Sequence, residues 1–306
     1  MTNDPADLGQ QVFHEHRRLL FSVAYRLLGS AADAEDAVQD AWIKWSAADR
    51  SQVADPKAYL TRIVSNVALE RLRSARHKRE TYVGPWLPEP ILTGGDASEA
   101  VTDAESVSMA VLVVLETLSP LERAVFVLRE VFDFSHAEIA EAVERSEAAV
   151  RQAAHRARAH VRARRPRFAA DRSRQREVTE RFFAAATGGD VNALMELLSP
   201  DVTLWTDGGG KVRQALRPVV GATTVAAWFA AIGTTTYQGI EPADMKAELV
   251  EINGGPGIVF SGPGRVIATV TLDFEADGRI VAIHNVANPD KLQAVADGTA
   301  HDIGTR

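Results

Sequence analysis

The spacing of apolar residues changes partway along this 306-residue chain, and this change limits its fold more than any other feature. Up to Arg165, apart from residues 81–102, apolar positions recur with the period of an α-helix, whereas helical stretches alternate with period-two stretches beyond Pro166. A chain of this length exceeds the usual size of one core. We therefore predict a multidomain protein with an all-α N-terminal half and an α+β C-terminal half.

Glycine, proline and serine positions divide these patterns into elements. The expected helices span residues 8–28, 31–47 and 57–79, four short stretches within 103–165, and then 173–187, 190–198 and 222–231. The expected strands span residues 201–206, 244–252, 265–274 and 279–287. In the clearest of them, residues 265–274, apolar and polar side chains alternate, which predicts a strand buried on one face only. Residues 81–102 hold three prolines and three glycines and are expected to form a linker.

The composition excludes several kinds of chemistry. The chain has no cysteine, which rules out a thiol nucleophile, a cysteine-ligated metal and a disulfide framework. We expect no metal and no cofactor. The N-terminus lacks the pattern of a secretory signal, and no apolar run approaches the ~18 residues of a membrane span, so we expect a cytoplasmic protein that binds no membrane.

Residues 133–165 form the most specific local pattern. Ser135 and Glu138 are spaced as a capping box for one short helix, and Ser146 is placed to cap the next, which predicts a helix-turn-helix. At 100° per residue, the second helix has an apolar stripe and an opposite basic one. Although the net charge is −7, residues 145–176 hold eleven arginines against two acidic residues.

The pattern therefore favours DNA binding over a solvated arginine-rich helix, and we see no acidic partners for the arginines at i+4. The candidate contacts to bases and phosphates are Ser146, Glu147, Ala148, Arg151, Gln152, His155, Arg158 and Arg162.

Two earlier helices carry polar stripes. In the helix at 31–47, Asp33, Asp36 and Asp40 share one face with Glu35 and Gln39 beside them, and a basic partner would relieve their repulsion. Solubility and a favourable helix dipole explain the stripe equally well. In the helix at 57–79, Arg62, Asn66, Arg73 and His77 fall on one side and form a mixed hydrogen-bonding and cationic face.

Aromatic residues accompany these stripes. The rings of Trp42, Trp45 and Tyr59 could stack on an unpaired base, although we favour a core position for both tryptophans.

The segments AYRLLGSAADAEDAVQDAWIKW and YLTRIVSNVALERLRS, a linker, and a terminal helix-turn-helix occur in the order found in bacterial extracytoplasmic-function sigma factors, which this chain resembles over residues 8–165. The resemblance implies sigma region 2 followed by region 4. Region 2 would bind the β′ coiled coil of core RNA polymerase through the acidic stripe and read the minus-ten element through Arg62, Asn66 and Arg73. Region 4 would bind the β flap and read the minus-thirty-five element.

The rest of the chain resembles the cone-shaped α+β fold of SnoaL-like polyketide cyclases and nuclear transport factor two. Three short segments are similar to signatures of the SigJ-type sub-group, which carries such a fused domain. They are Trp86, Leu87, Pro88, Glu89 and Pro90; Asp207, Gly208, Gly209, Gly210 and Lys211; and Asn288, Pro289, Asp290, Lys291 and Leu292. The resemblance implies that these segments form an interface through which the third domain regulates the sigma core in cis.

The expected domains are region 2 at 1–80, a linker at 81–105, region 4 at 106–168 and the SnoaL-like domain at 173–306. An open alternative is a small-molecule enzyme of the isomerase or cyclase type with an attached DNA-binding module. In it, His284, Asp207 and Trp205 would line a pocket inside the cone, where a His–Asp pair is sufficient for acid–base catalysis. We favour a regulatory or ligand-sensing domain over catalysis, with the ligand unknown.

Overall fold

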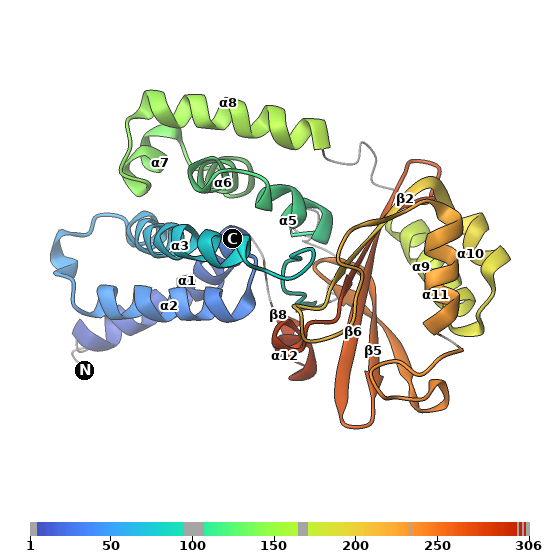
Figure 1. Ribbon diagram of the computed structural model, residues 1–306. Helices are drawn as coiled ribbons and strands as arrows, with labels where there is room; N and C mark the ends of the chain where they lie inside the picture. Colours follow the sequence, from blue (N-terminus) through green and yellow to red (C-terminus); the bar gives the residue numbers. More distant parts are fainter. Residues whose placement is uncertain are drawn as a thin grey trace.

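The computed structural model describes residues 5–94, 107–164, 171–232, 234–298, 300–301 and 303, and its elements follow the predicted change from helices to a sheet (Figure 1). The α-helices are α1 Pro5–Leu28, α2 Ala31–Ser46, α3 Pro56–Glu80, α5 Met109–Glu116, α6 Pro120–Phe126, α7 His136–Ala142, α8 Glu147–Arg164, α9 Arg172–Gly188, α10 Val191–Leu197, α11 Ala222–Ile232 and α12 Gln293–Ala296. The strands are β1 Leu92–Thr93, β2 Leu198–Asp207, β3 Val219–Val220, β4 Lys246–Ile252, β5 Gly255–Gly262, β6 Arg265–Phe274, β7 Ile280–Val286 and β8 Ala300–His301. Short 3₁₀ turns span Arg50–Gln52, Pro242–Asp244 and Pro289–Lys291, and a π-helical turn spans Val127–Val131.

Helices α1, α2 and α3 pack together as the first helical unit. Gly29, whose φ of +67° suits glycine, ends α1, and the Ser30 side chain accepts a hydrogen bond from Asp33 N at the start of α2. Apolar side chains from all three helices form the core of this unit, among them Leu20, Trp45 and Leu60. The predicted bounds of all three helices are correct to within three residues.

Helices α5 to α8 form the second unit, in which both predicted caps of the helix-turn-helix are present. Ser135 and Glu138 form the capping box of α7, and Ser146 Oγ accepts from Ala149 N at the start of α8. Between the two helices Glu144 has a φ of +53°, which turns the chain. The part of the predicted helical stretch at 103–106 lies outside the described residues.

The third unit is a sheet with α9, α10 and α11 on one face (Figure 1). The strand order is β3-β2-β7-β6-β5-β4-β1-β8. Strand β5 was missed, although Asn253-Gly254 before it is a typical two-residue hairpin turn with both φ angles positive. Among the described residues, no helix combines the length and apolar character needed to cross a membrane.

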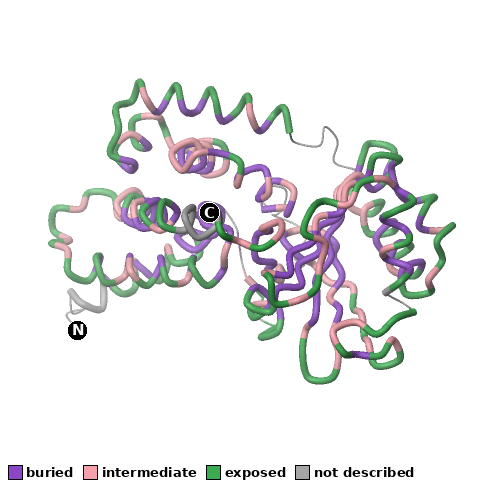
Figure 2. Tube along the Cα trace, in the orientation of Figure 1, coloured by how far each residue is buried: buried purple, intermediate pink, exposed green. Residues whose placement is uncertain are grey.

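The prediction that residues 265–274 are buried on one face only is wrong. On the polar face of β6, Thr269 and Thr271 are buried, as Figure 2 shows for the centre of the sheet. The reason is that this face is not solvated. The linker, α5 and the segment around Leu292 pack against the same side of the sheet.

One strand of the sheet, β1, comes from outside the third domain in sequence. The linker strand β1 pairs with β4, and β8 pairs with β1 on the other side. Part of the expected linker is therefore ordered secondary structure, because the backbone groups of Ile91 find partners on Asn253.

Candidate nucleic-acid interface and interdomain junction

Helix α8 presents the predicted candidate DNA contacts on one exposed face. Its apolar stripe of Val150, Ala153, Ala157 and Val161 is buried, as predicted from the helical period. The candidate residues Ser146, Glu147, Ala148, Arg151, Gln152, His155, Arg158 and Arg162 are all exposed. The face is thus available to a duplex, while the stripe holds the helix on its unit.

The expectation that these arginines lack acidic partners is wrong. Arg151 pairs with Glu147 one turn earlier, and Arg158 donates to Glu130 at 2.7 Å. Both pairs are exposed, so each contributes little to stability. A phosphate or a base edge can replace either carboxylate at small cost.

The acidic stripe of α2 has basic partners within the same unit. Arg71 of α3 contacts Asp40 at 2.6 Å and Asp36 at 3.3 Å, and these carboxylates raise its pKa. Arg17 contacts Glu35 at 2.5 Å. Asp33 and Gln39 are exposed beside them, so the stripe remains accessible at the surface.

On α3, Arg62 and Arg73 are exposed and Asn66 is half-buried, and the side chain of His77 lies outside the described part of the structure. The guanidinium of Arg62 lies 5.6 Å from the ring centre of Tyr59. Trp45 is 2% exposed and donates to Gly9 O, which confirms its predicted core position.

Helix α7 of the second unit packs against α3 of the first. A cavity of about 230 Å³ lies between them, and its walls include Tyr59, Arg62, Phe134, Ile139 and Glu141. The helix-turn-helix therefore lies directly beside the Arg62 end of α3 (Figure 1).

Asp207 is the centre of the junction between the helical units and the sheet. Its fully buried carboxylate accepts hydrogen bonds from Tyr82 Oη at 2.5 Å, Leu87 N at 2.9 Å and Lys291 Nζ at 2.7 Å. The Lys291 ammonium also lies 3.9 Å from the ring centre of Trp86 and 5.0 Å from that of Tyr82. The structure thus brings the three signature segments together at one buried ion pair.

The remaining signature residues complete this junction. Lys211 and Asp290 form a second ion pair at 2.6 Å, which is exposed. Gly209 has a φ of +58°, and a Cβ there would overlap the Asn288 side chain, so only glycine fits between the two loops.

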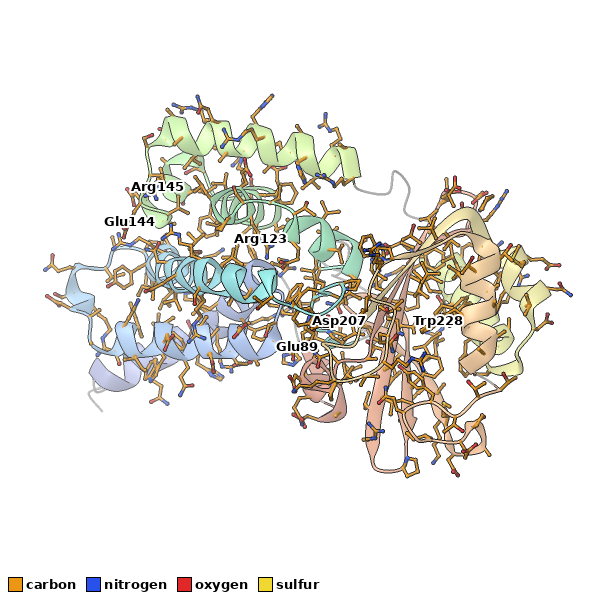
Figure 3. All side chains as sticks on the ribbon, in the orientation of Figure 1. Glu89, Arg123, Glu144, Arg145, Asp207 and Trp228 are labelled. Atoms are coloured by element: carbon orange, nitrogen blue, oxygen red, sulfur yellow. The ribbon has the colours of Figure 1, made fainter. Side chains whose placement is uncertain are left out.

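The segment around Glu89 attaches the linker to the first helical unit. The Glu89 carboxylate accepts from Ala31 N at 2.8 Å at the start of α2, and Glu89 N donates to Gly29 O at 2.8 Å. Burial raises the pKa of Glu89. Figure 3 shows Glu89 and Asp207 near each other between the helices and the sheet.

Several junction residues were missed because no local pattern marks them. Buried Tyr25 donates from its hydroxyl to Glu89 O at 2.7 Å and accepts from Asn253 Nδ2 at 2.6 Å. Buried Arg123 contacts Glu116 at 2.6 Å and donates to Leu27 O at 2.9 Å, so it joins the second unit to the end of α1. Burial lowers its pKa to about 9. Only the Asn-Gly turn offered a sequence signal.

The predicted pocket of His284, Asp207 and Trp205 is wrong. Trp205 is the register partner of His284, and both lie on the sheet face that packs against the linker and α5. Asp207 points to the linker, and His284 Nδ1 is instead 3.7 Å from Asp273. Alternation showed which residues share a face, but not which face the cone encloses.

The enclosed face carries Asn285, and the cavity there measures about 10 Å³. That volume is enough for about one water molecule.

Two family models match the helical units: "Sigma-70 region 2" over residues 12–78 and "Sigma-70, region 4" over residues 108–161. The chain is 43% identical over 290 residues to the "ECF RNA polymerase sigma factor SigJ" of Mycobacterium tuberculosis, covering 92% of each chain. It is 29% identical to the "Probable ECF RNA polymerase sigma factor SigI" of the same species, covering 90% of this chain and 92% of the relative. The crystal structure of that SigJ matches with a TM-score of 0.73 and 37% identity, covering 93% of this chain and 98% of the other.

Proposed function

Because this chain belongs to the extracytoplasmic-function RNA polymerase sigma factors, we propose that its third domain controls in cis how its two sigma units engage polymerase and promoter. The chain is an alternative sigma factor and not an enzyme, and it binds core RNA polymerase and promoter DNA. We place its action in the cytoplasm, and we divide it into region 2 at 1–80, a linker at 81–105, region 4 at 106–168 and the SnoaL-like domain at 173–306.

In this proposal, the acidic stripe of α2 binds the β′ coiled coil of the polymerase, and region 4 binds the β flap. The exposed positions of Asp33, Asp36 and Gln39 support this role. Arg17 of α1, which pairs with Glu35, is exposed, and Arg71 of α3, which pairs with Asp36, is half-buried. A basic surface on the polymerase can therefore compete for these carboxylates.

Helix α3 reads the minus-ten element through Arg62, Asn66 and Arg73, and α8 reads the minus-thirty-five element. The N-terminal residues of α8 face the base edges, and the later arginines contact phosphates. The exposed basic face of α8 supports this assignment.

The observation that carries the regulatory part is the close packing of α7 on α3. The two promoter elements are separated by about 25 base pairs, which is roughly 85 Å of duplex at about 3.4 Å per step. Because α7 packs on α3 and α8 follows α7 in the same helix-turn-helix, the readers α3 and α8 are held too close together to reach both elements at once. This arrangement is therefore a closed state that must open on the promoter. The buried junction of Asp207, Lys291 and Trp86 holds the third domain against the linker and stabilises the closed state.

Run-off transcription with purified core polymerase tests the proposal. Promoter-dependent transcripts from the full-length chain are expected, and Trp86→Ala, which removes the ring from Lys291, should raise their yield. Transcript levels and protease cleavage patterns identical to those of the parent would contradict regulation through this junction.

Polymerase docking is tested separately by pull-down with core enzyme. Asp33→Lys leaves the carboxylates bound by Arg71 unchanged and should weaken recovery, while the triple change of Asp33, Asp36 and Asp40 to Lys should abolish it. A matched control replaces Glu177, Glu180 and Glu196, three exposed acids of the third domain, by Lys. Equal recovery of the triple variant and the control would defeat the docking assignment.

A further inference from the structure

Ala300, His301 and Ile303, called here the tail segment, lie beside the linker strand β1 and helix α1 of region 2. Ile303 is 7% exposed and lies in the apolar core of the helical units, not in that of its own domain. Its backbone carbonyl accepts hydrogen bonds from Ser22 Oγ at 2.8 Å and from the Arg26 guanidinium at 3.1 Å. The tail segment therefore has specific partners on α1.

Two further contacts fix the direction of the tail segment. His301 stacks on Phe21, with ring centres 4.8 Å apart and planes within 11° of each other. Strand β8 pairs in parallel with the linker strand β1. The surface on α1 thus recognises an aromatic ring, an aliphatic side chain two residues later and the carbonyl of that second residue.

The guanidinium that binds the tail segment also contacts region 4. Arg26 is 1% exposed and lies 5.2 Å from the ring centre of Phe132, the residue after the π-helical turn. Arg123 of region 4 binds the carbonyl of the adjacent Leu27. The same end of α1 therefore carries both the tail segment and the docking point of region 4.

We propose that the tail segment is an intramolecular ligand of α1, and that its release loosens region 4 from region 2 through Arg26. When the tail segment leaves α1, the buried guanidinium of Arg26 loses the Ile303 carbonyl as a hydrogen-bond acceptor. A buried charged group with fewer hydrogen bonds is less stable. Arg26 then turns toward water and leaves Phe132 without its cation. This inference rests on the closed state proposed above. It identifies the contact of the tail segment with α1 as the one whose loss opens that state.

The chain has no cysteine, so pairs of introduced cysteines can be labelled specifically. Ala47→Cys, directly after α2, and Ala163→Cys, on α8, lie at exposed positions and report the distance between the two sigma units by double electron–electron resonance. In this labelled background, Ile303→Asp should convert a single narrow distance into a longer and broader distribution. Asp297→Ala is the matched control, because Asp297 is exposed and accepts a hydrogen bond from Gln293. This variant should keep the distance of the parent.

Rescue in trans separates release from misfolding. A synthetic peptide with the sequence of residues 297–306, added in excess to the Ile303→Asp chain, should restore the short distance, and the same peptide carrying Ile303→Asp should not. Where Ile303→Asp lowers the melting temperature too far, Ser22→Ala removes one of the two bonds and should shift the distribution partway. An unchanged distance in both folded variants would overturn the proposal.

The measurement contains neither polymerase nor DNA, so it does not depend on sigma activity. A shifted distance without any change in transcription would support the tail contact and contradict the regulatory function proposed above.

Discussion

Lys291 Nζ and Asp207 Oδ2 lie 2.7 Å apart in the buried junction of sheet and linker, whereas Lys211 and Asp290, in the same two signature segments, form an ion pair at the surface. The two pairs have the same chemistry and nearly the same length. The Lys291–Asp207 pair is buried and has further hydrogen-bond and ring partners, whereas the Lys211–Asp290 pair is exposed, and this difference decides how each responds to mutation.

We expect Lys291→Met to lower the free energy of unfolding by about 3–5 kcal/mol, because it leaves the Asp207 carboxylate buried without its cation. Lys211→Met should cost less than about 1 kcal/mol, since its pair is exposed. Urea unfolding of both variants measures the difference. Similar losses for the two would show that the buried junction does not stabilise the chain.

Arg151→Ala should weaken binding to the preferred promoter by about 1–3 kcal/mol if Arg151 contacts a base, with a smaller effect on scrambled DNA. Arg162→Ala should weaken both equally and reduce the salt slope by about one unit, as expected for a phosphate contact. Titrations at several salt concentrations test both statements. Equal losses on the two DNAs for Arg151→Ala would exclude base reading.

Asp273 predicts a pH dependence of stability. Burial raises its pKa from 3.8 to about 7, so its contribution to stability is full below pH 3.8 and is lost as the pH rises through 7. Asp273→Asn cannot titrate at this position. The free energy of unfolding of the variant, relative to that of the parent, should therefore rise by about 3 kcal/mol between pH 5 and pH 8.

His284, which lies 3.7 Å from Asp273, shifts in the opposite direction. Burial lowers its pKa to about 4, so its contribution is present above pH 6.5 and is lost as the pH falls through 4. In the folded state, His284 is therefore largely neutral between pH 5 and pH 8, both in the parent and in Asp273→Asn. Thermal unfolding of the two proteins at pH 5, 6, 7 and 8 provides the measurement, and a constant difference between them would refute the shift at Asp273.

Asn253→Gly should keep the hairpin turn but lower the free energy of unfolding by about 1–3 kcal/mol. Glycine adopts the positive φ readily, yet the buried bonds from Asn253 to Ile91 N and Tyr25 Oη are lost. Asn253→Asp keeps an oxygen that accepts from Ile91 N, so its loss of unfolding free energy should be smaller than that of Asn253→Gly. Unfolding curves identical to the parent for Asn253→Gly would show that the side chain does not attach the linker.

The sequence patterns predicted what is local in this fold. The caps at Ser135 and Ser146 and the buried stripe of α8 follow from spacing alone, because residues within a few turns of one helix fix them. Tyr82 and Asp207 meet across 125 positions, and no spacing rule connects them. The signatures indicated that an interface exists, but only the fold showed that its centre is a buried ion pair.

The sequence patterns also could not predict which face of a strand is covered by helices. Period-two alternation correctly placed His284 and Asn285 on opposite sides of β7, yet it could not show which side the helices cover. The polar side of the sheet was buried because a second unit of the same chain packs against it, and that contact is not encoded in any single strand.

The order of synthesis gives the tail contact a further consequence. Region 2 leaves the ribosome more than 200 residues before Ile303, and domains generally fold as they emerge. A nascent chain therefore passes through a stage in which α1 is folded while its ligand does not yet exist. In the proposed mechanism, the tail contact cannot hold the two sigma units in the closed state during that interval, so newly made molecules are the ones most able to meet polymerase.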